Sequence, residues 1–352
     1  MAGEIVEYEL AAPWEGFLAT PAAGPAEVGV VVLSGSSGRI ERERCRLFAR
    51  AGVTAASIRW FGRHGQPPGI CEVALETFVA ATELLRERGA ERVSILGVSK
   101  GAEAALLVST LSDCADAVIA LAPTSVVWAN VGPGRDGRER PCSSSWTWQE
   151  QPLPFVPYDD SWMPTEPEGT PISVLGSYER SLATYADLLP AAAIPVERSA
   201  AELVLIAGGA DRMWPSLRFA HELADRYAAT GRELAMISRP DAGHRSVFPG
   251  EVARPPPSGS TTAVPPKRMR YSARLPGRPC WRRSSVPESH ADNDQLILRR
   301  GWRRARTGAE TSSTHQSRQR LQHQRARTMR SPNGHQPAAE LSIEPSACSL
   351  GP

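Results

Sequence analysis

The sequence lacks long hydrophobic runs, and this absence limits where the protein is expected to work. No segment approaches the ~20 consecutive apolar residues that a bilayer-spanning helix needs. The N-terminus also lacks a basic stretch followed by an apolar one. We therefore expect no secretory signal, no membrane association and a cytoplasmic location.

Cysteine is scarce, and its spacing fits neither zinc-type pairs nor a small disulfide framework. Histidine and carboxylate pairs at metal-ligand spacing are missing as well. Neither G-x-G-x-x-G nor the G-K-[ST] ending of a phosphate-binding loop is present. These absences predict no cofactor, no metal and no nucleotide, and they predict free thiols at four positions of the N-terminal part: Cys45, Cys71, Cys114 and Cys142.

Positive and negative residues are unevenly distributed between the two parts of the chain. The net charge is +2, but Val252–Pro352 carries 18 Lys and Arg against 6 Asp and Glu, and the first 251 residues carry 22 against 32. Hydrophobic periodicity also stops near Val252. We therefore interpret residues 1–251 as the folded domain and residues 252–352 as a basic, disordered tail. A nucleic-acid-binding arm is the alternative, although we expect no nucleic acid partner.

Apolar runs and amphipathic segments alternate within the first 251 residues. Val28–Leu33 is a β-branched run typical of a strand covered on both faces, and Glu72–Arg88 has the apolar spacing of a helix. Other expected strands are Val53–Ile58, Arg92–Leu96, Ala117–Leu121, Leu203–Ala207 and Glu233–Ile237, and other expected helices are Arg39–Arg50, Gly101–Leu111 and Ser216–Ala229. This alternation predicts an α/β fold with a mostly parallel, doubly wound sheet, whose ligand site lies at the carboxyl ends of the strands.

The alternation stops between residues 122 and 199. This segment is rich in proline and contains four tryptophans, Trp128, Trp146, Trp148 and Trp162. We interpret it as a cap inserted over the active site. A long surface excursion with tryptophans packed on the core is the alternative.

A candidate nucleophile lies between a predicted strand and a predicted helix. Gly97-Val98-Ser99-Lys100-Gly101 matches G-x-S-x-G, in which a strained turn lifts the serine hydroxyl off the sheet. The following helix directs its positive end at the same place. The context favours Ser99 as the nucleophile over an incidental serine in a glycine-rich turn.

An acid and a base follow the serine in the order that such turns use. Asp211 comes just after the predicted strand Leu203–Ala207, and His244 follows the last predicted strand. The histidine would accept the serine proton while the aspartate fixes its tautomer. Asp241 competes for the role of the acid, but it more naturally shapes the turn before His244.

Acyl transfer also needs backbone N–H groups directed at the carbonyl oxygen. One is expected from Lys100, the residue after the nucleophile. The other is expected from the loop after the first core strand, at Gly35 or Ser36.

With these residues assigned, the chain resembles the C-terminal domain shared by acyl-CoA thioesterases and bile-acid-CoA:amino-acid N-acyltransferase, in its bacterial form. The resemblance covers about residues 1–250. It rests on VVLSGSSG (Val31–Gly38), RWFGRHGQPPGICEVALETF (Arg59–Phe78), GVSKGAEAAL (Gly97–Leu106), GGADRMWPS (Gly208–Ser216) and PDAGH (Pro240–His244). It implies an α/β-hydrolase fold, a Ser99–Asp211–His244 triad and a small-molecule acyl-CoA or acyl ester substrate.

Two departures from the family bear on the reaction. The mammalian members carry an N-terminal β-sandwich domain, which the roughly 27 residues before Val28 cannot form. Members that transfer acyl groups to amino acids use cysteine where this chain has Ser99. Both differences favour hydrolysis. A dienelactone-type hydrolase or carboxylesterase, or an inactive product with a non-native tail, is the alternative.

The basic tail has a second interpretation. Lysine occurs at only two positions while Ala, Gly, Arg and Pro abound, a composition that indicates GC-rich coding DNA. Thr261–Ser272, back-translated and read one nucleotide earlier with permitted wobble bases, gives H-G-G-T-P-E-A-D-A-V-L, which resembles the C-terminal motif of the same family. We therefore hypothesise a frame shift near Gly250–Ser260, which resequencing the gene would test.

Overall fold

Eight strands form one sheet in the computed structural model, which describes residues 3–24, 26–138, 142–167 and 170–251. The strand order is β1-β2-β4-β3-β6-β7-β10-β11, with β2 antiparallel to both neighbours and all later neighbours parallel. The strands are β1 (Ile5–Leu10), β2 (Gly16–Pro21), β3 (Val28–Leu33), β4 (Thr54–Ile58), β6 (Arg92–Val98), β7 (Ala117–Leu121), β10 (Glu202–Gly208) and β11 (Ala235–Arg239). The predicted tail lies outside the described residues, so both interpretations of it stay predictions.

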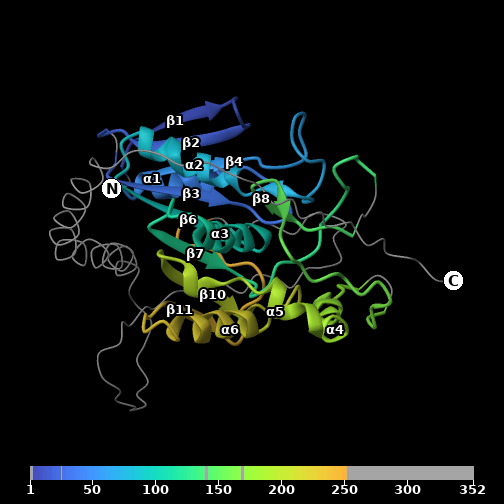
Figure 1. Cartoon of the computed structure of the whole chain (residues 1–352). Coiled ribbons are helices and arrows are strands. Elements are labelled where there is room, and N and C mark those ends of the chain that lie inside the picture. Colours follow the sequence, from blue (N-terminus) through green and yellow to red (C-terminus); the bar gives the residue numbers. More distant parts are fainter. Residues whose placement is uncertain (1–2, 25, 139–141, 168–169, 252–352) are drawn as a thin grey trace, which may run out of the picture. The chain divides into compact units, whose positions relative to one another are not determined.

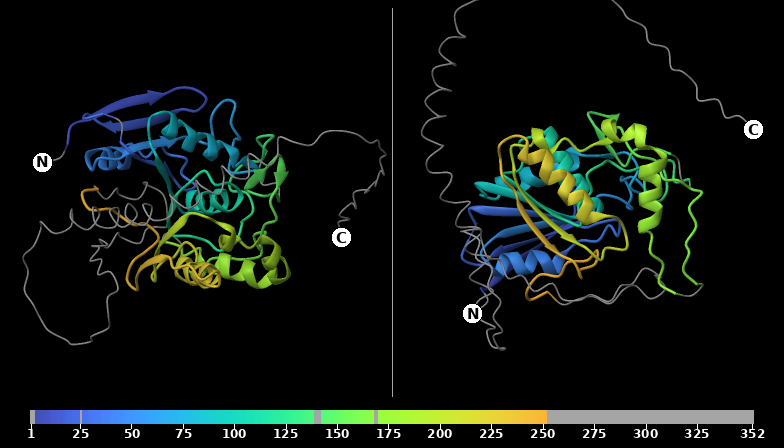
Figure 2. Two further views of the ribbon diagram at one scale, coloured as in Figure 1. Left: turned by 60° about the vertical axis from the view of Figure 1, so that its left-hand side comes forward. Right: turned by 90° about the horizontal axis from the view of Figure 1, so that it is seen from below.

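Helices cover both faces of this sheet. Helix α1 (Arg42–Arg50) lies on one face, against β2 and β4, while α2 (Glu76–Glu87), α3 (Lys100–Leu111) and α6 (Ser216–Ala228) lie on the other (Figures 1 and 2). This arrangement confirms the predicted α/β-hydrolase fold with a mostly parallel, doubly wound sheet.

The core forms where the sequence is apolar on both faces of a strand. Four successive residues of β3, Val30 to Leu33, are completely buried. The same holds for β4, where only Thr54 retains slight exposure to solvent. Each large apolar side chain among them, such as Val31 or Ile58, stabilises the fold by roughly 1.5–3 kcal/mol relative to an exposed one. Helix α3 is buried from Lys100 to Ser109, so it is the central helix, and its Ala-rich sequence lets it pack closely on β6 and β7.

A long excursion separates β7 from β10. It contains β8 (Trp146–Trp148) and β9 (Gln151–Pro152), which form a small sheet with β5 (Val73–Ala74). The helical elements that follow are α4 (Leu175–Thr184), η1 (Ala186–Leu188), α5 (Leu189–Ala192) and η2 (Val196–Arg198). The pairing of β5 with β8 explains why the helix expected from Glu72 begins at Glu76 instead.

Other features agree with the composition. No helix among the described residues has both the length and the apolar character needed to cross a bilayer. The four cysteines named above are free thiols. Sequence analysis had assigned no element before Val28, where the structure has the antiparallel edge pair β1 and β2.

Candidate active site

Ser99 occupies the turn between β6 and α3 in a conformation that few non-glycine residues adopt. Its φ is 55° and its ψ is −120°, a geometry that costs on the order of 1–3 kcal/mol. The Ser99 N–H donates to the Leu121 carbonyl at 2.9 Å, which ties the turn to the neighbouring strand β7. The side chain is partly exposed although both flanking elements are buried. The turn therefore presents the hydroxyl at the carboxyl edge of the sheet.

The two glycines of the turn are required by close backbone contacts. A Cβ at Gly97 would lie 2.1 Å from the Gly101 carbonyl oxygen, and a Cβ at Gly101 would lie 2.3 Å from the Ser34 carbonyl oxygen. No side chain fits at either position. The G-x-S-x-G pattern thus follows from how closely β6, α3 and the end of β3 approach one another.

The loop after β3 lies against Ser99. A Cβ built on Gly35 would lie 3.1 Å from Ser99 Cβ and 3.7 Å from its Oγ. Within the described residues, the backbone N–H groups of Ser36 and Lys100 donate to no acceptor. Free N–H groups beside a serine hydroxyl have the chemistry that a developing oxyanion needs.

Asp211 and His244 meet at the ends of β10 and β11. His244 Nδ1 lies 2.8 Å from Asp211 Oδ2, and the two side chains are 15% and 2% exposed. The other oxygen, Asp211 Oδ1, accepts the N–H groups of Met213 at 2.8 Å and Trp214 at 3.4 Å. The carboxylate is thus held from both sides, and its orientation fixes that of the imidazole.

Close backbone packing brings these two loops together. A Cβ at Gly208 would lie 2.2 Å from the Ala242 carbonyl oxygen, and the Ala210 N–H donates to that oxygen at 2.9 Å. Asp241, the competing acid, instead forms a half-exposed ion pair with Arg239 at 3.3 Å. The geometry of the His244 contact therefore favours Asp211 as its carboxylate partner.

Ser99 and His244 are not joined in this structure. Both follow strands of the same parallel sheet, β6 and β11, so they lie at the same edge. Yet in the part of the chain described here, no hydrogen bond connects the Ser99 hydroxyl to the imidazole. Such contacts are often loose in unliganded hydrolases and tighten around substrate.

Several aromatic residues lie on the His244 side of the site. Sequence analysis did not assign them to it. The Trp214 ring packs edge-on against the His244 ring at 5.7 Å, and Tyr178 packs edge-on against Trp214 at 5.6 Å. Tyr178 also packs edge-on against Tyr158 at 5.7 Å, and the Tyr158 hydroxyl donates to the Ala129 carbonyl at 3.5 Å. Burial raises the pKa of Tyr178 to about 12 and also raises the pKa of Tyr158 well above its ordinary value. Both phenols are therefore neutral at physiological pH. Tryptophan density in residues 122–199 was the sequence signal for this cluster.

The side chains of Lys100 and Glu103 were not predicted as part of the site. Lys100 Nζ lies 2.6 Å from Glu103 Oε2, in close contact but not aligned as a hydrogen bond. Burial lowers the pKa of Lys100, and the attraction of Glu103 opposes that shift. Residues three apart on a helix lie on the same face, and this spacing brings the two side chains together.

Comparisons with known proteins agree with this architecture. Residues 73–251 match the family model described as "BAAT / Acyl-CoA thioester hydrolase C terminal". Acyl-coenzyme A thioesterase 2, mitochondrial, from Mus musculus is 24% identical over 228 residues, which cover 64% of this chain and 46% of the relative. Acyl-coenzyme A thioesterase 1 from Rattus norvegicus is 23% identical over 228 residues, covering 64% and 49%. The chain thus spans about half the length of the curated relatives it matches.

Solved structures similar to this one include two hydrolases. A putative dienelactone hydrolase from Klebsiella pneumoniae has 16% sequence identity and a TM-score of 0.44, with coverage of 69% of this chain and 88% of that chain. An esterase from Pyrococcus furiosus has 13% identity and a TM-score of 0.42, with coverage of 69% and 85%.

Proposed function

Because the chain belongs to the BAAT / acyl-CoA thioester hydrolase C-terminal family, we propose that it hydrolyses an acyl thioester of the acyl-coenzyme A type through an acyl-enzyme on Ser99. The observation that carries the proposal is the strained, partly exposed Ser99 beside free backbone N–H groups, at the sheet edge where Asp211 holds His244. The domain that performs this reaction is residues 1–251.

Each of these residues carries out a different step of the reaction. His244 takes the proton from Ser99 Oγ, which attacks the thioester carbonyl carbon. The carbonyl oxygen becomes an oxyanion and accepts hydrogen bonds from the backbone N–H groups of Lys100 and of Gly35 or Ser36. Collapse of this intermediate breaks the carbon–sulfur bond, and His244 gives its proton to the departing thiolate. Water, deprotonated by His244, then releases the acid from Ser99.

Asp211 supports both halves of this cycle. Its carboxylate accepts the Nδ1–H of His244, which leaves Nε2 free to receive the serine proton. Each time His244 becomes an imidazolium, the buried negative charge beside it offsets the positive one. The serine must come within hydrogen-bond reach of Nε2, so the mechanism needs a small movement of the His244 loop when substrate binds.

The excursion between β7 and β10, residues 122–199, acts in this proposal as a cap. Its aromatic side chains approach His244 through Tyr178 and Trp214. Such a wall suits an acyl chain, which gains free energy by leaving water. The cap thereby separates the acyl-enzyme from bulk solvent.

Two arginines favour a leaving group that carries negative charge. Arg39 lies four residues after Gly35, in the same loop between β3 and α1, and Arg245 directly follows His244. Partial desolvation and, after it, the nearby Arg39 lower the pKa of Arg245, while Glu41 opposes the shift. Arg39 also forms an ion pair with Glu41 at 3.7 Å, so the two arginines and this carboxylate together carry a net positive charge. Such a charge attracts phosphate groups, which coenzyme A supplies and a simple ester does not. A cytoplasmic location belongs to the same proposal.

The first experiment replaces the nucleophile. Ser99→Ala should abolish release of free thiol from acyl-coenzyme A and labelling by a fluorophosphonate probe, because no other hydroxyl occupies the turn. Ser109→Ala, on the same helix but with its hydroxyl bonded to the Leu106 carbonyl, is the matched control and should keep both. Thiol release by Ser99→Ala at the wild-type rate would exclude the proposed mechanism.

A second comparison separates thioesterase from esterase. Acyl-coenzyme A, the N-acetylcysteamine thioester of the same acid and its p-nitrophenyl ester differ only in the leaving group. We expect the lowest KM for acyl-coenzyme A, because only this substrate carries phosphates. A higher kcat/KM for the p-nitrophenyl ester or a lactone would favour a carboxylesterase or dienelactone-type hydrolase.

A further inference from the structure

A buried ion pair lies directly behind the nucleophile. Lys100 Nζ and Glu103 Oε2 are 2.6 Å apart, with the two side chains 3% and 0% exposed. Removing two charges from water is costly, and replacing such a pair with apolar residues is often neutral or stabilising. A contribution to stability therefore does not explain the pair, and its position next to Ser99 calls for another role.

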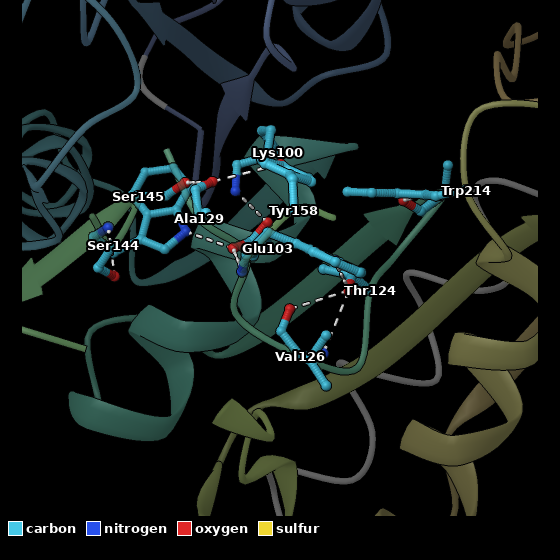
Figure 3. A network of polar contacts seen from close by, with 12 residues as sticks. Lys100, Glu103, Thr124, Val126, Ala129, Ser144, Ser145, Tyr158 and Trp214 are labelled. Carbon is cyan, nitrogen blue, oxygen red and sulfur yellow. Dashed lines mark hydrogen bonds and ion pairs between the residues drawn. The ribbon is translucent and has the colours of Figure 1, made fainter. Parts of the chain in front are cut away.

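The second oxygen of Glu103 holds two separate parts of the cap. Glu103 Oε1 accepts the backbone N–H of Trp128 at 3.0 Å and the indole Nε1–H of Trp146 at 2.8 Å. Figure 3 shows Glu103 at the centre of this network, next to Lys100. The Lys100 ammonium also lies 5.3 Å from the centre of the Trp146 ring. One carboxylate thus joins α3 to the first and second parts of the excursion.

Glu103 is bound equally closely to the nucleophile's own turn. Its backbone N–H donates to the Ser99 carbonyl at 3.0 Å, which closes the first turn of α3. Lys100 follows Ser99 in this first turn, and its backbone N–H is one of the proposed oxyanion donors. Any displacement of Glu103 is therefore transmitted to both Ser99 and that donor.

From Trp128 the contacts continue to the base. Trp128 packs edge-on against Tyr178 at 4.8 Å, Tyr178 against Trp214 at 5.6 Å and Trp214 against His244 at 5.7 Å. Trp214 Nε1–H also donates to the Ala122 carbonyl at 3.2 Å. Trp128 and Tyr178 of the cap, together with Trp214 after β10, therefore form one packed series of side chains from the contact with Glu103 of α3 to His244.

We propose that Glu103 is a positioning residue, which holds the cap against the first turn of α3 and so fixes the Lys100 amide relative to Ser99 and His244. This role rests on the proposed function of Ser99. Lys100 has the complementary role of balancing charge. An unbalanced carboxylate behind the oxyanion donors would oppose the negative charge that develops there, whereas the neutral pair does not.

Two double variants test the role without leaving a lone buried charge. Lys100→Met/Glu103→Gln keeps a carbonyl oxygen for the N–H groups of Trp128 and Trp146, whereas Lys100→Met/Glu103→Met removes it. Both variants lack the Lys100 ammonium, so their kcat values are compared with each other. We expect kcat of the second to lie on the order of 10²-fold below that of the first, as small misplacements of reacting groups produce, with KM little changed. Hydrogen exchange at the Trp128 amide should rise only in the second.

A variant at the end of β6 away from Ser99 serves as the control for a general loss of stability. Val93→Ala removes buried methyl groups there and, compared at matched distance from its melting temperature, should keep wild-type kcat. Equal kcat in the two double variants, or an equal loss in Val93→Ala, would overturn the positioning role. With Ser99→Ala inactive, that result leaves the proposed function intact. Full activity of Ser99→Ala instead overturns both.

Discussion

At the scale of the residue, the contact between Asp211 and His244 makes the sharpest prediction. Asp211→Asn preserves shape and can still accept the N–H groups of Met213 and Trp214. Its amide nitrogen, however, would face His244 Nδ1 and favour the tautomer that carries the proton on Nε2, which is then unable to accept from serine. We expect kcat to fall on the order of 10⁴-fold, with little change in melting temperature, as steady-state thiol release and thermal unfolding would show.

Asp241→Asn is the matched control for that variant. Asp241 lies in the same turn, three residues before His244, but its carboxylate pairs with Arg239 at a half-exposed site. An exposed pair of this kind contributes little to stability. We expect near-wild-type kcat, and a larger loss in Asp241→Asn than in Asp211→Asn would transfer the role of the acid to Asp241.

At the scale of the element, the close approach of the loops after β10 and β11 decides whether Asp211 and His244 meet. Gly208→Ala would place a methyl group 2.2 Å from the Ala242 carbonyl oxygen, so the His244 loop must move away from β10. The Asp211–His244 contact should lengthen, and kcat should fall on the order of 10²-fold. Kinetics with a crystal structure of the variant would measure both.

Gly29→Ala provides the comparison for this effect. It too is a tight glycine in a strand of the same sheet, with a Cβ position 3.0 Å from Ala90 Cβ, but it lies at the start of β3, away from the site. It should lower the melting temperature without a specific loss of kcat. If both variants lose kcat in proportion to stability, the loop approach has no particular role in the reaction.

The elements also show which features are predictable from sequence. β3, β6, β7 and β10 were found to within two residues because a strand buried on both faces reads as a continuous apolar run. β1 was missed because this edge strand carries exposed and charged residues, whose pattern resembles that of a loop. β2 was left unassigned although it is buried from Gly16 to Ala19 between β1 and β4, because its apolar run is short and ends at Pro21.

The candidate site divides along the same line. The turn of Ser99 and the loops of Asp211 and His244 follow strand ends, so strand prediction locates them. Glu103 depends on contacts 25 and 43 residues away, with Trp128 and Trp146, and no local pattern encodes such partners. Helical spacing would place it on a solvated face, whereas in the structure it is completely buried.

At the scale of the whole molecule, the last described residues tie the His244 loop to the opposite face of the sheet. Arg44 of α1 bonds to the Glu251 carboxylate and the Ser246 carbonyl, both at 3.0 Å. Phe248 packs edge-on against Phe48 of the same helix at 6.1 Å. The segment after His244 is thus fastened to α1, and this anchor restrains the loop that carries the base.

This anchor predicts where the chain can be shortened. A chain ending at Glu251 keeps Ser99, Asp211, His244 and the Arg44 contacts, so we expect kcat and melting temperature close to those of the full chain. A chain ending at Arg245 loses the Glu251 carboxylate and the Phe248 ring, so its His244 loop should exchange amide hydrogen faster and its kcat should fall. Arg44→Met in the full chain should weaken the same anchor without shortening the chain. Loss of activity on ending the chain at Glu251 would instead assign residues 252–352 a part in the reaction, against their interpretation as a non-native tail.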